Sequence, residues 1–298
     1  MTRTPIIDSH VHLWNRRHPS LRWDWLDPQA VHPILGNIDG IKSTGYEAEN
    51  LWAEARFADV AAFVHVEAAL GSPDPVEETR WLTEMARRTG HPAALVAHVD
   101  LGGEDAVPEL DGHQESPLMR GVRDFATEAY LTTGTTTRNY EASLTELSRR
   151  GLVLDLDCEW PHMAAARELA DRHPELVIVL EHIGYPRRRD AEYFAGWRHG
   201  ITELARAENV LCKVSGVAMT DPHFTRESLE PWVVHSLESF GPDRCMIGSN
   251  WPVDRLFSSY DVIMNLYRDF VASLSADEQV QVLHDNAAAT FRIPPGHA

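Results

Sequence analysis

Short apolar runs alternate with amphipathic stretches along the 298-residue chain. Eight of these runs have the length and composition of buried strands, at residues 5–12, 59–67, 93–100, 118–124, 152–157, 177–183, 210–216 and 244–250. The stretches between them have helical spacing. In residues 74–90, for example, Asp74 can cap, Pro75 suits the first helical position and Gly90 ends the run. Strands and helices in alternation predict an α/β fold, a (β/α)8 TIM barrel.

The competing architecture is an open, doubly wound sheet. No glycine-rich phosphate-binding sequence follows any of the expected strands, which removes the usual reason to prefer that sheet. No linker rich in Pro, Gly or Ser divides the sequence, and barrels commonly have this length. We therefore expect one barrel domain over residues 1–298.

The first expected strand carries two histidines in the stretch "IIDSHVHLWN". Successive side chains of a strand alternate between its faces, so Ile6, Asp8, His10 and His12 should share one side. A pair of imidazoles on one face can supply two ligands to a metal, or two polarising groups to a substrate. The alternative is two ordinary polar residues at a strand end.

The other expected strands also end in polar residues, namely Glu67, His98, Arg123, Asp157, His182, Lys213, Ser215, Ser249 and Asn250. Functional residues of a barrel lie at the carboxyl ends of its strands, so this pattern predicts a charged mouth over a packed interior. Taken singly, His65 and His98 read as hydrogen-bonded interior residues, and Lys213 as the partner of a carboxylate.

Strand register gives two further expectations. Gly121 and Arg123 should face the interior while Arg120 faces the helices, and Glu67 should share the inner face with Phe63 and His65.

A long connection over residues 15–58 follows the first expected strand and carries Trp23 and Trp25. Long loops at the functional end of a barrel serve as lids or specificity elements, and these tryptophans serve equally well as anchors or substrate contacts. Three more tryptophans, Trp14, Trp160 and Trp251, stand near strand ends. They predict aromatic walls for a flat or ring-shaped ligand, with core packing as the alternative.

Composition narrows the class of partner. The net charge of −18 argues against nucleic acid or an anionic membrane, and a small-molecule substrate fits better. No signal-like or membrane-length apolar segment occurs, so we expect a cytoplasmic protein. The three cysteines have no spacing that suggests a disulfide framework or a thiolate zinc site. The sequence leaves open whether the chain forms a homo-oligomer.

Several motifs together resemble one family. "IDSHVHLW", "FVHVEA", "GVRD", "LEHIGYP", "KVSG", "GSNWPVD" and "DNAAATF" are similar to the lactonase-type branch of the amidohydrolase superfamily, from residue 6 to about 292. The resemblance implies a distorted (β/α)8 barrel that hydrolyses a cyclic ester or amide. It also implies that His10 and His12 are the first-strand pair, His182 the later histidine, and Arg123 the residue that holds a substrate carboxylate in some relatives.

The eighth strand departs from this family pattern. Relatives commonly carry an aspartate where this chain has Asn250, and an amide cannot take a proton from water. We expect Glu67 to act as general base or metal ligand, with Asp254 as the second candidate for the base. The fifth strand also differs, because Asp157 and Glu159 stand where many metal-binding members have a histidine.

Two kinds of catalysis therefore remain open. One zinc ion could rest on His10, His12, His182 and Glu67. Alternatively, the histidines and Arg123 polarise the carbonyl without a metal. In either case we expect a hydrolase that opens a small lactone carrying a carboxylate or several hydroxyls. The alternatives are a metal-dependent decarboxylase of an unsaturated or aromatic acid, and a small-molecule binder that has lost catalysis at Asn250.

Overall fold

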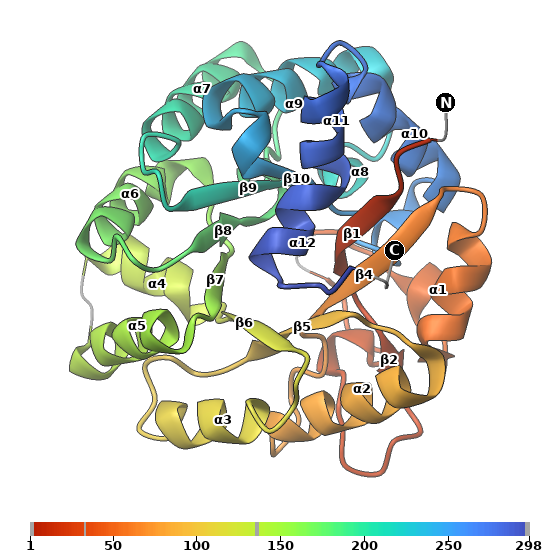
Figure 1. Cartoon of the computed structure of the whole chain (residues 1–298), viewed down its shortest axis with the longest axis vertical. Coiled ribbons are helices and arrows are strands. Elements are labelled where there is room, and N and C mark those ends of the chain that lie inside the picture. The colour runs from red at the N-terminus through yellow and green to blue at the C-terminus, as the bar shows by residue number, and fades with distance from the viewer. Residues whose placement is uncertain (1–2, 33, 135–136, 296–298) are drawn as a thin grey trace.

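The structure is a computed structural model that describes residues 3–32, 34–134 and 137–295. Eight parallel strands form one sheet in the order β1, β4, β5, β6, β7, β8, β9 and β10. Their bounds are Ile6–Val11, Val60–Val66, Ala94–His98, Met119–Arg123, Val153–Leu156, Ile178–Leu180, Val210–Val214 and Cys245–Ile247. All eight strands expected from the sequence are therefore present, and the sheet curls into a nearly closed barrel (Figure 1).

The ring closes between β1 and the residues after β10. Val11 forms a parallel bridge with Trp251. The amide of His12 donates to the carbonyl of Trp251 at 2.8 Å, and the amide of Asn250 donates to the carbonyl of His10 at 2.9 Å. These bonds join both site histidines of β1 to the eighth strand end.

Helices surround the strands as an outer ring (Figure 1). Their bounds are Ala48–Ala55 (α1), Val76–Thr89 (α2), Ala106–His113 (α3), Ala126–Thr133 (α4), Arg138–Arg150 (α5), Met163–Arg172 (α6), Ala191–Leu204 (α7), Val217–Thr220 (α8), Arg226–Phe240 (α9), Tyr260–Val271 (α10), Ala276–Val280 (α11) and Asn286–Thr290 (α12). The expected helix over 74–90 corresponds to α2, and both α2 and α5 end at a left-handed glycine, Gly90 and Gly151. No helix of the described chain is long and apolar enough to cross a bilayer.

Two apolar layers hold the barrel together. The larger layer fills the space between strands and helices. The smaller layer includes Ile7, Val64, Val96 and Met246, and it also contains Phe291 after α12. Residues of alternate parity on the strands thus fill the interior, and the end of the chain closes it from below. The polar mouth is built on top of this packed floor.

The connection after β1 is less irregular than its length suggests. Trp14–Asn15 (β2) pairs antiparallel with Gly45–Tyr46 (β3), and short 3-10 turns occupy Asp24–Leu26 and Asp39–Ile41. Trp23 is buried and packs edge-on against Trp81 of α2, with ring centroids 5.7 Å apart. Trp23 is thus an anchor that fixes this connection to the barrel.

Two expectations based on strict alternation are wrong. The pairing of β1 with β4 shifts register between Asp8 and Val11, so Asp8 does not join the histidines. Its carboxylate accepts hydrogen bonds from Ser249 and Tyr260 instead.

On β4, the interior is lined by Ala62, Val64 and Val66, whereas Phe63 packs in the layer under the helices. His65 also points away from the barrel axis, because it contacts Glu78 of α2 at 3.2 Å. Glu67 does not share a face with Phe63 and His65; it follows the strand end and turns toward the mouth.

Candidate active site

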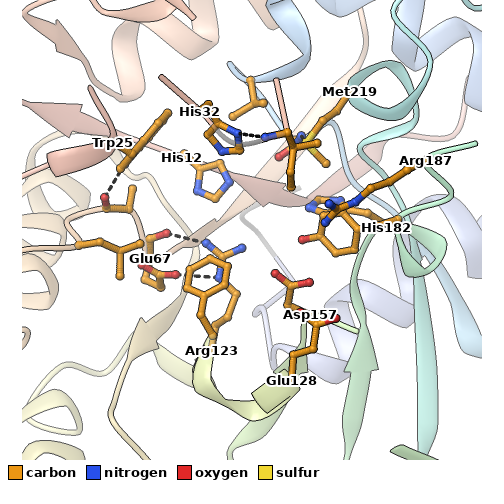
Figure 2. A pocket seen from close by; sticks show the side chains of 17 residues that line it. His12, Trp25, His32, Glu67, Arg123, Glu128, Asp157, His182, Arg187 and Met219 are labelled. Carbon is orange, nitrogen blue, oxygen red and sulfur yellow. Dashed lines mark hydrogen bonds and ion pairs between the residues drawn. The ribbon is translucent and has the colours of Figure 1, made fainter. Parts of the chain in front are cut away.

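A cavity of about 330 Å³ opens at the carboxyl ends of the strands, as the polar strand ends predict. Its walls come from the end of β6 and the segments after β1, β4, β7, β8, β9 and β10, with part of the 15–58 connection above (Figure 2). The lining residues are His12, Trp25, His32, Ile34, Glu67, Ala68, Leu70, Arg123, Phe125, Glu128, Asp157, His182, Tyr185, Arg187, Met219, Asn250 and Val253.

Three histidines meet at the base of this cavity. Nε2 of His10 lies 3.1 Å from Nε2 of His12, and the rings of His10 and His182 have centroids 4.4 Å apart. Nδ1 of His12 donates to the carbonyl of Val66 at 2.9 Å, so Nε2 of His12 carries a lone pair and no proton. Nδ1 of His182 hydrogen-bonds the hydroxyl of Ser215 at 2.7 Å. The pairing expected for β1 is confirmed, and the third histidine joins it.

All three imidazoles are neutral at physiological pH. Burial, together with nearby cationic groups, lowers the pKa of His12 to about 3. Burial likewise lowers the pKa of His182 to about 3, although the Glu181 carboxylate opposes the shift. The pKa of His10 is also lowered well below its usual value, chiefly by burial. Neutral imidazoles can ligate a metal or hydrogen-bond a carbonyl oxygen.

Arg123 lies between two carboxylates. Its Nε donates to Glu67 at 2.8 Å and its NH1 donates to Glu181 at 3.0 Å, and all three side chains are buried. Burial opposes ionisation of Glu181, but the charge and hydrogen bond of Arg123, together with Lys213 and His182, outweigh burial and lower the pKa of this carboxyl to about 2. For Glu67, burial outweighs the same arginine and raises the pKa. The expected inward register of Arg123 is confirmed, and its guanidinium already has two anionic partners.

Glu181 was not among the residues expected in the site, although it stands in the "EHIGYP" motif. It reads from sequence as the end of an apolar strand. The structure instead ends β8 at Leu180 and turns the backbone into a left-handed stretch, with φ of 53° at His182, 49° at Ile183 and 51° at Tyr185. This conformation is unfavourable for a β-branched residue such as Ile183. It places Glu181, His182 and Tyr185 together around the cavity base.

The donor set fits a divalent cation. His10, Glu181 and His182 offer ligand atoms within 4.8 Å of one another. Two nitrogen ligands of one tetrahedral zinc ion lie about 3.3 Å apart, close to the 3.1 Å between the Nε2 atoms of His10 and His12.

Two nitrogens at that distance also require a proton or a cation between them. Nδ1 of His10 lies 3.3 Å from a Glu181 oxygen but has no hydrogen-bond partner among the described residues. A proton on that Nδ1 would leave both Nε2 lone pairs free for one ion. Glu67, the fourth ligand expected from sequence, has one oxygen bound to Arg123 and one without a partner.

Asn250 lines the cavity and is held in a single orientation. Its Nδ2 donates to Asp254 at 3.0 Å and contacts the sulfur of Met219 at 3.6 Å, so its carbonyl oxygen is free for a water or a substrate hydroxyl. The backbone has φ of 57°, which asparagine tolerates better than most residues.

Asp254 is buried and is not among the lining residues. Burial raises its pKa to about 7. The residue orients Asn250 and does not face the cavity.

Two further charged groups occupy the base and the side of the site. Lys213 forms a buried ion pair with Asp155 below the cavity, as its reading as a carboxylate partner predicts. Asp157 lines the cavity and points into it between Arg123 and His182 (Figure 2). The expectation that Asp157 faces the mouth is confirmed by its position; its role there stays a prediction.

The tryptophans expected to wall the pocket do not line it. Trp14 is buried against Trp25 and Tyr46, Trp160 packs on Tyr193, and Trp251 packs on Tyr260. The aromatic lining residues are Trp25, Phe125 and Tyr185. Position near a strand end in the sequence does not tell the aromatic residues that line the cavity from those that pack elsewhere. The direction of each ring depends on the turn that follows the strand. His32, from the 15–58 connection, also lines the cavity and was not expected.

Comparison with known proteins identifies the family. Residues 7–293 match the amidohydrolase family. The chain is 35% identical to an uncharacterised protein of Sinorhizobium fredii over 98% of this chain and 100% of that protein. It is 28% identical to an L-fucono-1,5-lactonase of Burkholderia multivorans, over 97% of this chain and 96% of that enzyme.

The fold agrees with this assignment. A crystal structure of an amidohydrolase from Burkholderia multivorans, with bound zinc, has a TM-score of 0.82 and 25% identity and covers 97% of this chain and 100% of that one. The chain therefore belongs to the amidohydrolase family and is a hydrolase of its lactonase-like branch.

Proposed function

We propose that this enzyme hydrolyses a neutral, polyhydroxylated lactone to the open-chain hydroxy acid. The observation that carries the proposal is the charge of the cavity, in which both lining arginines already have anionic partners. Lactonase relatives support the reaction class, including the L-fucono-1,5-lactonase of Burkholderia multivorans at 28% identity. The choice of a neutral substrate rests on the side chains themselves.

Neither cation of the cavity is available for a substrate carboxylate. Arg123 pairs with Glu67 and Glu181, and Arg187 pairs with Glu159 at 2.7 Å. Beyond these partners, Glu128 and Asp157 add two further carboxyl groups to the lining. An anionic lactone would meet a net negative wall, whereas hydroxyl groups can donate to these carboxylates. This favours the polyhydroxylated alternative over the carboxylated one.

The reaction adds water across the ring ester. Water forms a bond to the carbonyl carbon and loses a proton, and the ring C–O bond then breaks and its oxygen takes up a proton. His12 and His182 both line the cavity, with orientations fixed by Val66 and Ser215. When Ser215 donates to Nδ1 of His182, the Nε2–H of that neutral imidazole can donate to the lactone carbonyl oxygen, whereas Nε2 of His12 carries a lone pair and suits a metal ion. Asn250, held by Asp254, offers its carbonyl oxygen to the attacking water. A fixed donor such as the Nε2–H of His182 stabilises the negative charge that develops on the carbonyl oxygen.

A metal ion would strengthen this arrangement. We propose a single divalent ion, with zinc as the first choice, held by His10, His12 and His182 with Glu181 beside them. Support comes from the convergence of these donors and from zinc in the related Burkholderia structure. When bound, such an ion supplies Lewis acidity to the lactone carbonyl. Elemental analysis of the purified protein, with activity measured before and after chelation, tests this part separately.

The function is tested with matched lactones. We expect proton release from L-fucono-1,5-lactone and related neutral sugar lactones, with kcat/KM about 10- to 100-fold above that for the same ring carrying a carboxylate. Preference for the carboxylated ring would overturn the neutral-substrate proposal.

The same assay addresses the decarboxylase alternative, because ring opening releases acid whereas decarboxylation releases CO2 from an aromatic or unsaturated acid. Carbon dioxide release without lactone turnover would overturn the proposed reaction.

A further inference from the structure

The site lacks a general base at the position where the sequence pattern leads one to look. Water must lose a proton during lactone hydrolysis, and the amide of Asn250 cannot accept it. Asp254 does not line the cavity; it accepts hydrogen bonds from Asn250 and from the amide of Ala218 at 3.2 Å. Another carboxylate that reaches the cavity has to perform this step.

Three carboxylates line the cavity, and two of them already contact a basic side chain. Glu67 is buried in an ion pair, in which one oxygen accepts from the Nε of Arg123 at 2.8 Å, and this arginine partly offsets the rise that burial causes in the pKa of Glu67. Glu128 lies within 3.1 Å of Nδ1 of His162 and is about one-third exposed, at the side of the cavity away from the histidines. Glu181 is buried beneath the lining and is bound by Arg123.

Asp157 differs from these groups. It makes no hydrogen bond and no ion pair within the described parts of the chain, and it points into the cavity between Arg123 and His182 (Figure 2). The position of Asp157 at the level of the mouth follows from alternation along β7 (Val153–Leu156). Val153 packs in the apolar interior of the barrel, Asp155 pairs with Lys213 above it, and Asp157 follows at the same parity and reaches the mouth. The carboxylate therefore follows directly on a strand of the barrel, and it lines the same cavity as Asn250.

We propose that Asp157 is the catalytic base that takes the proton from the attacking water in place of the residue absent at position 250. This inference rests on the proposed lactone hydrolysis. The step balances without a co-reactant. Asp157 accepts one proton as the water oxygen bonds to the carbonyl carbon, and it returns that proton to the ring oxygen as the ring C–O bond breaks.

The surroundings of Asp157 suit proton transfer near neutral pH. Burial, and next the charge of Glu181, raise the pKa of Asp157 to about 7, with Glu128 acting in the same direction. Arg123 and Arg187 oppose the shift, and Tyr185 is the neighbouring hydroxyl. A base with a pKa near the working pH is half ionised and still basic enough to take the proton.

The experiment measures turnover of one neutral sugar lactone by the full-length wild-type enzyme and by Asp157→Ala, Asp157→Asn and Glu67→Ala. We expect both Asp157 variants to lose about 10²- to 10⁴-fold in kcat with KM changed less than threefold. Sodium formate should restore Asp157→Ala at least tenfold, because the small carboxylate fits the space vacated by the side chain. Formate should not restore Asp157→Asn, in which the amide fills that space.

Each other outcome decides against the proposal. A kcat within threefold of wild type in Asp157→Ala removes the residue from proton transfer, and a rise in KM alone assigns it to substrate binding. Formate rescue of Glu67→Ala without rescue of Asp157→Ala makes Glu67 the base. Thermal unfolding of each variant identifies loss of fold, and Asp157→Asn, which keeps the shape, then supplies the kinetic comparison. If wild type itself opens no lactone, the proposed function fails, whereas failure confined to the variants overturns only the role of Asp157.

Discussion

Two groups of buried polar side chains start from the same strand and differ in how completely they are hydrogen-bonded. Around Asp8, the carboxylate accepts from the amide and hydroxyl of Ser249 at 2.7 and 2.6 Å and from Tyr260 at 2.7 Å. Around His10, two residues further on, Nδ1 of His10 and Oε2 of Glu67 have no partner among the described residues. Both groups are buried, so burial of polar residues alone does not distinguish a structural network from a functional one. The unsatisfied polar atoms distinguish them.

The largest effect should come from the open group. Replacing His12 with Ala or His182 with Asn should lower kcat/KM at least 10³-fold, about 4 kcal/mol or more in transition-state stabilisation. Asn is chosen at 182 because φ there is 53°. The double variant should lose far less than the sum of the two effects. Steady-state kinetics with thermal unfolding measures both; a large fall in melting temperature with full activity of the folded fraction would place these histidines in the structural class.

The closed group should respond in the opposite way. Asp8→Ala removes the acceptor of four buried donors, namely the amides of His10 and Ser249 and the hydroxyls of Ser249 and Tyr260, and should lower the free energy of unfolding by about 3 kcal/mol. Urea denaturation gives this value, and the folded variant should keep its KM. A loss of activity with unchanged stability would show that Asp8 belongs to the functional group and not to the structural one.

A smaller, pH-dependent effect is expected at Glu78, which belongs to the structural class. One of its oxygens accepts from His65 and from the amides of Ala68 and Ala69, and burial raises its pKa to about 7. In the folded protein Glu78 keeps its proton up to about pH 7, whereas in the unfolded chain it releases that proton near pH 4.5. The ionised unfolded state is therefore favoured as pH rises from 4.5 to 7, and Glu78 lowers the free energy of unfolding over this range. Glu78→Gln keeps the acceptor and carries no charge.

Thermal unfolding at pH 5 and at pH 8 measures the effect. The free energy of unfolding of Glu78→Gln, relative to that of wild type, should be about 2 kcal/mol higher at pH 8 than at pH 5. An unchanged difference across this range would contradict the assignment.

The smallest expected effect is at Ser215, which is fully buried and bonds Nδ1 of His182. Ser215→Ala should lower kcat about fivefold, roughly 1 kcal/mol, while KM changes little. If a metal is bound, its affinity should fall about 10-fold or more, since a partner that orients a ligating histidine is removed. Equal losses at Ser215 and His182 would mean that the hydroxyl itself takes part in the reaction.

The fold was accessible from the sequence because each strand is a short apolar run bounded by a turn residue. The carboxyl ends of those runs also placed His12, Glu67, Arg123, Asp157 and Asn250 in one cavity. Alternation was sufficient at Gly121 and Arg123 because β6 pairs in regular register with both neighbours from Gly121 to Arg123. It failed at Asp8, where β1 shifts register, and no local sequence signal marks that bulge.

The parts of the site that escaped prediction depend on contacts between distant segments. Glu181 reads as strand, but the left-handed turn after Leu180 points it at Arg123, 58 residues earlier. His32 reaches the cavity through a loop whose path is fixed by tertiary packing. The tryptophans near strand ends illustrate the same limit, since their directions are decided by turns and not by position along the chain.

The hydrogen bonds between the end of β1 and the residues after β10 bear on how the enzyme forms during synthesis. His10 and His12 are made about 240 residues before Asn250 and Trp251, to which their backbone is hydrogen-bonded. The mouth of the barrel is incomplete until the segment with Asn250 and Trp251 has paired with the end of β1. A ligand of the mouth therefore binds only molecules in which the ring of strands is closed. Contacts this distant in sequence form slowly. A substrate or ion that binds the finished mouth would therefore slow reopening of the ring and lengthen the lifetime of the folded enzyme.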